Sequence, residues 1–255
     1  DKKKRELLLA RDYFGIKPLH YFYDGNVLIF CSEIKGIISS GLYKPSPNDQ
    51  ALHDLLNLRY VPGEQTLFKD IHRVAAGTVI KIKDKKFYQN KYYSLKCAPH
   101  NKASEQEIAD NIYHLLSASV KKQLVSDVPV GVYLSGGMDS SSLVALQRSH
   151  CPQGPIPTFT LKFVSETEEV NDAQAIADYF KTDHHVFDIS SNPLDVMKEV
   201  LWHVEEPKIN ALQGYLLAYN TSRFVKVVHG GLGGDELFAG YEYHKYIATA
   251  YSFSK

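Results

Sequence analysis

Residues 130–146 read VGVYLSGGMDSSSLVAL. The apolar run that begins at Val130 predicts a short buried strand, and the Ser/Gly turn after it opens a helix at the three serines, residues 140–142. The first N–H groups of a helix lack intrahelical acceptors, and the helix dipole adds positive potential at that end. This stretch therefore predicts a site for an anion such as phosphate.

The loop at residues 135–140 differs from the two best-known phosphate loops. A Walker loop needs Lys and then Ser or Thr after its last glycine, whereas Met138 and Asp139 follow Gly137. A dinucleotide-binding fingerprint needs a third glycine where Ser140 stands. The remaining pattern, SGGxDS, resembles the pyrophosphate loop of the ATP pyrophosphatases, which cleave ATP between the α- and β-phosphates.

Asp139 distinguishes this interpretation from an ordinary glycine turn. A carboxylate beside an anion site repels phosphate unless a cation lies between them, so Asp139 predicts Mg²⁺.

A second glycine-rich stretch, GGLGGDELFAGY, occupies residues 230–241. Its glycines let the backbone pass close to a ligand. The acidic pair that follows, Asp235 and Glu236, is by itself typical of a helix N-terminus. Two such strand exits in one sheet favour a shared Mg²⁺ site instead.

The second half of the chain predicts an α/β fold. Strands expected at residues 158–163, 185–189 and 225–229 alternate with helices expected at residues 171–180, 193–204 and 212–224. This alternation is typical of a parallel sheet covered on both faces, which binds ligands at the carboxyl ends of its strands. A capping box at Ser104 and Glu107 opens a preceding helix. Its apolar stripe is expected to be core packing and comprises Ile108, Ile112, Leu115, Leu116 and Val120.

The first ninety residues predict an α+β domain. Strands are expected at residues 7–10, 20–23, 27–31 and 78–83, with helices at residues 33–39 and 49–58. Residues 88–104 are expected to form a connector that contains Pro99. We therefore predict a first domain at residues 1–93, a linker at residues 94–104 and a second domain at residues 105–255.

Composition limits the class of protein. Among 255 residues, 29 Lys and Arg balance 29 Asp and Glu, so neither a nucleic acid nor a membrane surface is expected as the main partner. No apolar run is long enough to span a bilayer. Three widely spaced cysteines, Cys31, Cys97 and Cys151, fit a reducing cytoplasm. The chain lacks an initiator Met, and we expect it to be a piece of a longer protein.

Two further stretches carry a second resemblance. RDYFGIKPL at residues 11–19 and SEIK at residues 32–35 resemble the later part of the glutaminase domain of class II glutamine amidotransferases, a fold with an N-terminal Cys nucleophile. The resemblance implies that this nucleophile lies upstream, with none in this chain. Cys31 is expected to be a small buried hydrophobe in a strand. Arg11, Asp12 and Glu33 are predicted to be structural ion pairs or loop anchors.

Together the motifs resemble the glutamine-hydrolysing asparagine synthetases. The resemblance implies a ligase in which the aspartate side chain attacks the α-phosphorus of ATP, pyrophosphate leaves, and ammonia from glutamine attacks the aspartyl adenylate. ATP and Mg²⁺ are the implied cofactors, the other partners are small molecules, and a homodimer is compatible. The implied catalytic and Mg²⁺-binding residues are Asp139 and Asp235. Asp139 is also an implied ATP-binding residue. The resemblance further implies that Leu134 and Leu161 line the adenine and ribose pocket and that Gly230 and Gly231 face the nucleotide. The residues implied to hold the pyrophosphate are Ser135, Gly136, Gly137 and Ser140.

Leu232 departs from the family pattern, which usually has Glu at that place between the glycines. Since Leu232 can neither accept nor donate a proton, either the substrate-side chemistry is arranged differently or the acceptor is not aspartate but another carboxylic acid, as in the related β-lactam synthetases. A separate alternative is a nucleotide-binding paralogue without catalysis. A further acidic pair, Glu205 and Glu206, either faces the acceptor pocket or ends a helix, and we favour the second.

Overall fold

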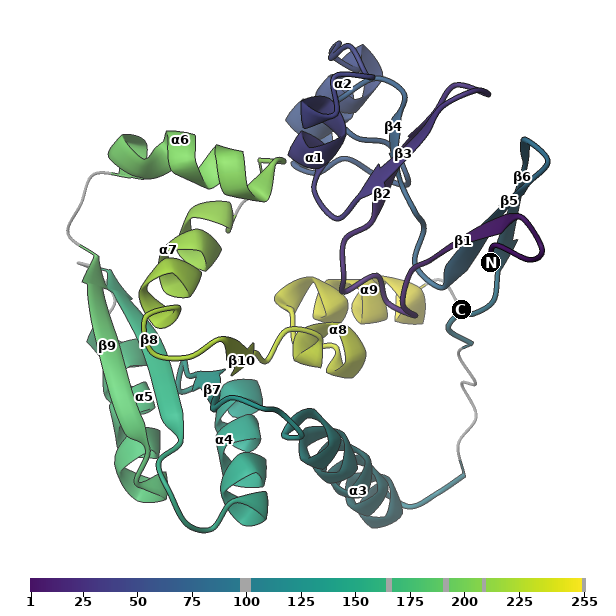
Figure 1. The fold of residues 1–255 in the computed structure, drawn as a ribbon. Helices are drawn as coiled ribbons and strands as arrows, with labels where there is room; N and C mark the ends of the chain where they lie inside the picture. Colours follow the sequence, from purple (N-terminus) through teal and green to yellow (C-terminus); the bar gives the residue numbers. More distant parts are fainter. Residues whose placement is uncertain (97–101, 164–166, 190–192, 208–209, 254–255) are drawn as a thin grey trace. The chain divides into compact units, whose positions relative to one another are not determined.

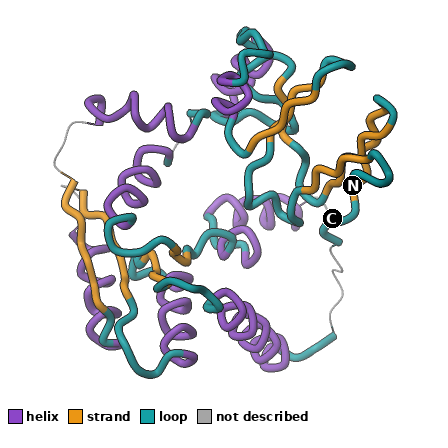
Figure 2. Tube along the Cα trace, viewed as in Figure 1, coloured by secondary structure: helices purple, strands orange, loops and turns teal. Residues whose placement is uncertain are grey.

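A computed structural model describes residues 1–96, 102–163, 167–189, 193–207 and 210–253 (Figures 1 and 2). The chain divides into two compact units. The first contains Asp1–Asn101 and Leu194–Leu212, and the second contains Lys102–Pro193 and Gln213–Lys255. Residues 194–212, which the sequence places in the second domain, therefore group with the first unit.

The second unit is built on a four-stranded parallel sheet. Its order is β10-β7-β8-β9, and every neighbouring pair is parallel. The strands are β7 (Val130–Tyr133), β8 (Pro157–Phe163), β9 (Asp183–Ile189) and β10 (Val227–His229). The connecting helices α4 (Met138–His150) and α5 (Thr167–Phe180) contact β7, β8 and β9. The predicted α/β fold with a parallel sheet is confirmed.

A buried apolar cluster holds the sheet to α4 and α5. Its members, each nearly inaccessible to solvent, are Val132, Leu134, Val144, Ile156, Ala173 and Ala177. They come from strand ends and from the inward faces of both helices, so one dry core fixes the point at which β7 passes into α4. Burial of such side chains stabilises the fold by about 25 cal/mol per Å² of apolar surface.

The helix α3 (Glu105–Gln123) begins with the predicted capping box: Ser104 accepts from the Glu107 N–H, and the Glu107 side chain accepts from the Ser104 N–H. The prediction that its whole apolar stripe is core was wrong. Val120 is buried, but the Leu115 side chain is 71% exposed. The physical reason is that α3 packs on α4 near its C-terminal end, where Ser117 contacts His150 at 2.9 Å.

Three further helices belong wholly or mostly to the second unit. They are α7 (Ala211–Thr221), whose first two residues belong to the first unit, α8 (Gly234–Phe238) and α9 (Glu242–Phe253). The sequence did not predict α9, and α4 begins two residues earlier than the serines suggested. None of the described helices has both the length and the apolar character needed to cross a membrane.

The first unit contains two antiparallel three-stranded sheets, β1-β5-β6 and β3-β2-β4. Its strands are β1 (Glu6–Ala10), β2 (His20–Tyr23), β3 (Leu28–Cys31), β4 (Ile71–Arg73), β5 (Thr78–Lys83) and β6 (Lys86–Lys91). Its helices are α1 (Ile34–Ser39), α2 (Asp49–Leu58) and most of α6 (Pro193–Val204). The sequence missed β4, which is short, and placed most of β6 in the connector.

Arg11 and Asp12 are loop anchors, as predicted. The Arg11 guanidinium donates to the carbonyls of Lys17, Val74 and Gly15 at 2.7–3.1 Å. The Asp12 carboxylate accepts from three backbone N–H groups between residues 14 and 17 at 2.9–3.2 Å, which lowers its pKa. Both side chains therefore hold the turn between β1 and β2.

We expect Val144→Ala to lower the free energy of unfolding by about 2 kcal/mol, because it removes two buried carbon atoms and leaves a cavity. Val144 is fully buried in α4, whereas Leu115 on α3 is exposed. Leu115→Ala, the matched control, should change stability by less than about 0.5 kcal/mol. Urea unfolding followed by circular dichroism measures both. An equal loss in the two variants would contradict the burial described for α3.

Candidate functional site

The site lies where the order of the parallel sheet reverses. From β7 the chain continues through α4 to β8 on one side, while β10 pairs with β7 on the other side. Because the strands are parallel, the loops after β7 and β10 leave from the same edge, and such switch points form crevices that bind ligands. A cavity of about 650 Å³ opens there, and all its lining residues belong to the second unit.

The loop after β7 is held by its own serines. The Ser135 N–H donates to Ser140 Oγ at 3.2 Å, and the Ser140 hydroxyl donates to the Gly137 carbonyl at 3.1 Å. The Leu134 N–H donates to the Phe159 carbonyl at 2.9 Å, which ties the loop to β8. Ser140 is buried, so its hydroxyl braces the turn from inside. The loop is thus preorganised at the N-terminus of α4.

Gly136 supports this turn from behind. Its φ of +77° is one that side chains disfavour, and an added Cβ would lie 2.8 Å from the Ala173 backbone nitrogen. The described residues that line the cavity do not include Gly136. Its observed contribution is therefore the close approach of the turn to α5.

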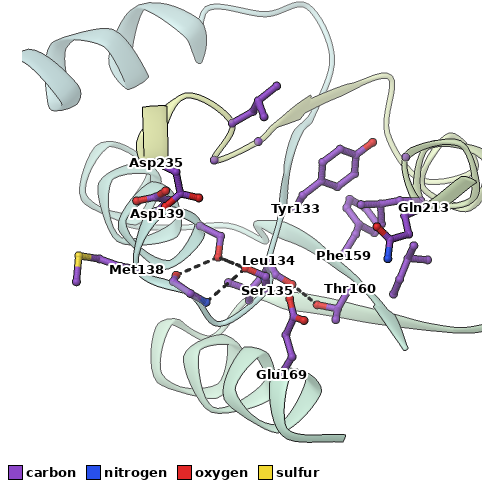
Figure 3. A pocket seen from close by; sticks show the side chains of 18 of the residues that line it. Tyr133, Leu134, Ser135, Met138, Asp139, Phe159, Thr160, Glu169, Gln213 and Asp235 are labelled. Carbon is purple, nitrogen blue, oxygen red and sulfur yellow. Dashed lines mark hydrogen bonds between the residues drawn. The ribbon is translucent and has the colours of Figure 1, made fainter. Parts of the chain in front are cut away.

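The loop after β10 comes into contact with Asp139. A Cβ on Gly231 would lie 3.1 Å from Asp139 Cβ, and one on Gly234 would overlap the Asp139 carboxylate. Gly234 directly precedes Asp235, and both aspartates line the cavity. Figure 3 shows their carboxylates at the same end of the pocket. The two glycine-rich loops therefore bring Asp139 and Asp235 together although they are far apart in sequence.

Glu236 holds the second loop in shape. Its carboxylate accepts from the Gly233 N–H at 3.0 Å and from the Tyr241 hydroxyl at 2.8 Å. The hydrogen bond from Tyr241 lowers the pKa of Glu236, and the nearby carboxylate raises the pKa of Tyr241 to about 12. Glu236 is thereby engaged in clamping the loop, whereas Asp139 and Asp235 form the acidic end of the pocket.

The charges around the cavity are of one sign. The described residues that line it include Asp139, Glu169, Asp235 and Glu236, and none of those described is Lys, Arg or His. A polyphosphate would meet repulsion here without a cation. Two carboxylates suit Mg²⁺, which commonly binds one or two carboxylates together with phosphate oxygens and water. Among the described residues, no group of three or more His, Cys, Asp and Glu side chains is placed to hold a metal ion.

The remaining predicted site residues lie close by. The cavity is lined by Leu134, Ser135, Gly137, Ser140, Leu161, Gly230 and Gly231 in addition to the two aspartates. Sequence reasoning missed Tyr133, Phe159, Gln213 and Leu217, which also line it. Tyr133 could have been found from its place at the end of β7, whereas Phe159 lies inside β8. Gln213 and Leu217 carried no sequence signal, because α7 reaches the cavity only through tertiary packing.

Comparisons with known proteins agree with this architecture. The family model described as asparagine synthase matches residues 111–253, and that described as glutamine amidotransferase domain matches residues 1–93. The chain belongs to the asparagine synthase family. The two matched regions follow one another along the chain without overlap.

Three curated relatives illustrate the likeness. "Putative asparagine synthetase (glutamine-hydrolyzing) 2" of Methanocaldococcus jannaschii is 31% identical over 96% of this chain and 48% of its own length. Asparagine synthetase (glutamine-hydrolyzing) 1 of Bacillus subtilis is 30% identical over 96% of this chain and 39% of its own length. Amidase chyE of Penicillium rubens is 30% identical, with 95% and 39% covered. The chain thus spans less than half of the length of each of these three relatives.

Solved structures give weaker matches. The glutamine-dependent NAD⁺ synthetase from Acinetobacter baumannii aligns with a TM-score of 0.41 and 16% identity, over 87% of this chain and 51% of its own. The NH3-dependent NAD synthetase from Campylobacter jejuni gives a TM-score of 0.36 and 18% identity, over 52% and 60%. Membership of the asparagine synthase family therefore rests on sequence, not on these alignments.

We expect Tyr241 to titrate near pH 12 and Glu236→Gln to move its pKa back toward 10, because the neutral amide no longer favours the protonated phenol. The clamp is therefore complete below about pH 10 and is lost as the pH rises through about 12. NMR titration of labelled tyrosine, assigned with Tyr241→Phe, measures this. Glu242→Gln is the control. An unchanged Tyr241 pKa in Glu236→Gln would contradict the clamp.

Proposed function

We propose that the protein is an ATP-dependent, AMP-forming amidotransferase that converts aspartate to asparagine with nitrogen from glutamine or ammonia. One observation carries the proposal: two glycine-rich loops at adjacent parallel strands bring Asp139 and Asp235 to one cavity. Membership of the asparagine synthase family and the amidotransferase match at residues 1–93 support the same activity.

The proposed roles follow from the chemistry of each wall. The turn at residues 135–140 and the N-terminus of α4 hold the leaving pyrophosphate, because oriented N–H groups stabilise developing negative charge. Asp139 and Asp235 hold Mg²⁺. When bound, the metal neutralises phosphate charge. Leu134 and Leu161 provide an apolar surface for the adenine and ribose.

The proposed reaction has two bond exchanges. A carboxylate oxygen of aspartate bonds to the α-phosphorus while the bond to the β-phosphate oxygen breaks, releasing pyrophosphate. Ammonia then bonds to the acyl carbon and loses one proton, the bond from that carbon to the bridging oxygen breaks, and AMP departs with the carboxylate-derived oxygen. The loop residues act in the first step by orienting the triphosphate and by excluding water from the acyl adenylate.

We expect the full-length protein to release AMP and pyrophosphate from ATP labelled in its α- and β-phosphates. Asp139→Asn and Asp235→Asn should each lower this rate by at least about 100-fold. Each variant removes one of the two carboxylates proposed to bind the Mg²⁺ that neutralises phosphate charge. Asp127→Asn, at an exposed aspartate away from the cavity, is the control. Formation of ADP and phosphate without AMP would contradict the proposal. Mg-ATP binding without turnover would favour an inactive paralogue.

A second acceptor class is favoured by Leu232. Its side chain is 93% exposed at the cavity wall, where Leu161, Phe163 and Leu217 also contribute apolar surface. A wall of this kind accommodates an uncharged acyl chain better than the second carboxylate of aspartate, because a charge loses hydration there without gaining a partner. Under this alternative the adenylation chemistry is kept and the acceptor is another carboxylic acid.

A panel of carboxylic acids separates the two acceptors. If Leu232 selects the acceptor, an acid with an uncharged chain should release pyrophosphate faster than aspartate does. Leu232→Ala should then reduce that preference by about tenfold, because it removes apolar contacts. Leu237→Ala, at an exposed leucine outside the cavity lining, should leave it unchanged. Rapid release that depends on aspartate would exclude this second acceptor class.

A further inference from the structure

The backbone ladder between β7 and β8 ends at the cavity. Its last backbone pair is Tyr133 with Phe159, and the Leu134 N–H then donates to the Phe159 carbonyl at 2.9 Å. A parallel ladder that continued by one residue would give the Leu134 carbonyl an N–H from Leu161. In the described sheet, the pairing of these two strands ends before that bond.

A side chain supplies the donor in place of that backbone group. The Thr160 hydroxyl donates to the Leu134 carbonyl, as the dashed line in Figure 3 shows. Thr160 is only 4% exposed, and both residues line the cavity. Threonine competes with a ladder in this way because its hydroxyl reaches nearby backbone groups. The Leu134 carbonyl is therefore satisfied at the point where the chain leaves β7.

The Leu161 N–H points toward the side of β8 on which β7 has ended. The Phe159 carbonyl points to that side, because it accepts from Leu134. Backbone groups of residues two apart in a strand point to the same side, so those of Leu161 do as well. Leu161 also lines the cavity. A backbone N–H at such a place is one of the few polar groups by which a pocket orients a small ligand.

We propose that Thr160 is a positioning residue of this site. Its hydroxyl holds the Leu134 carbonyl, ends the ladder between β7 and β8, and so leaves the Leu161 N–H to an acceptor atom of the bound ligand. The same bond fixes the first residue before the turn that Ser140 braces from inside. The identity of the ligand rests on the proposed function, under which it is ATP. The effect on the ladder does not rest on that function.

Thr158 provides a matched control on the same strand. It is fully buried, and its side chain lies on the same face of β8 as that of Thr160, because the two are two residues apart. Its hydroxyl lies 2.8 Å from Thr182 Oγ1 and 2.9 Å from His184 Nδ1. Thr158 is not among the described residues that line the cavity. Thr158→Val therefore removes a buried hydroxyl from β8 and leaves the bond to Leu134 in place.

Amide hydrogen exchange at single-residue resolution, in the ligand-free full-length protein, tests the effect on the ladder. In Thr160→Val the Leu134 carbonyl loses its donor, so the Leu161 N–H should bond to it and exchange roughly tenfold more slowly. Thr160→Ser keeps the hydroxyl and should behave like the wild type, and Thr158→Val should not slow exchange at Leu161. A general loss of stability speeds exchange, so it cannot imitate this result. Unchanged or faster exchange at Leu161 in Thr160→Val would overturn the proposal.

Calorimetric titration with Mg-ATP tests the effect on the ligand. Thr160→Val should raise the Kd roughly tenfold, because the ligand loses the Leu161 N–H, whereas Thr160→Ser and Thr158→Val should stay within about twofold of the wild type. Equal weakening in Thr160→Val and Thr158→Val, or none in either, would contradict the positioning role. Wild-type protein that binds no Mg-ATP would refute the proposed function, and exchange in the ligand-free protein would still decide whether Thr160 ends the ladder.

Discussion

The parallel pairing of β7 with β10 is the constraint on which the rest of the site depends. Val130, Gly131 and Val132 pair with residues 227–229, so both strands end at the same edge of the sheet. The missing side chain of Gly131 leaves room for the Phe159 ring of β8, because a Cβ at residue 131 would lie 2.6 Å from that ring. Two loops separated by about ninety residues of sequence thereby become the two sides of one cavity.

The charges that line the cavity limit the kinds of ligand it can bind. Acidic side chains line it, and the part of the chain that the structure describes contributes no cationic side chain to it. Phosphate binding in such a pocket depends on backbone N–H groups and on a metal ion. Glu236 is held by Gly233 and Tyr241, and Asp139 and Asp235 are the pair that we propose for that ion. The glycines at 231 and 234 matter because they admit the Asp139 side chain.

The two units are not the two halves of the sequence. The segment from residue 194 to residue 212 returns to the first unit and is held there by paired charges that are mostly shielded from solvent. Such pairs add little net stability over apolar packing, but removing one partner is costly because it leaves a shielded charge unpaired.

Local patterns in the sequence determined the parallel α/β architecture, the capping box of α3 and the turn anchored by Arg11 and Asp12, because each depends on residues close together in the chain. They also marked Asp139 and Asp235 as candidates. Only the tertiary structure decided that both line one cavity, that α7 adds Gln213 and Leu217, and that much of the α3 stripe is exposed. It also revealed that Glu205 caps α1. These features arise from contacts between distant segments, which depend on strand order and helix packing and leave no period or motif in the sequence.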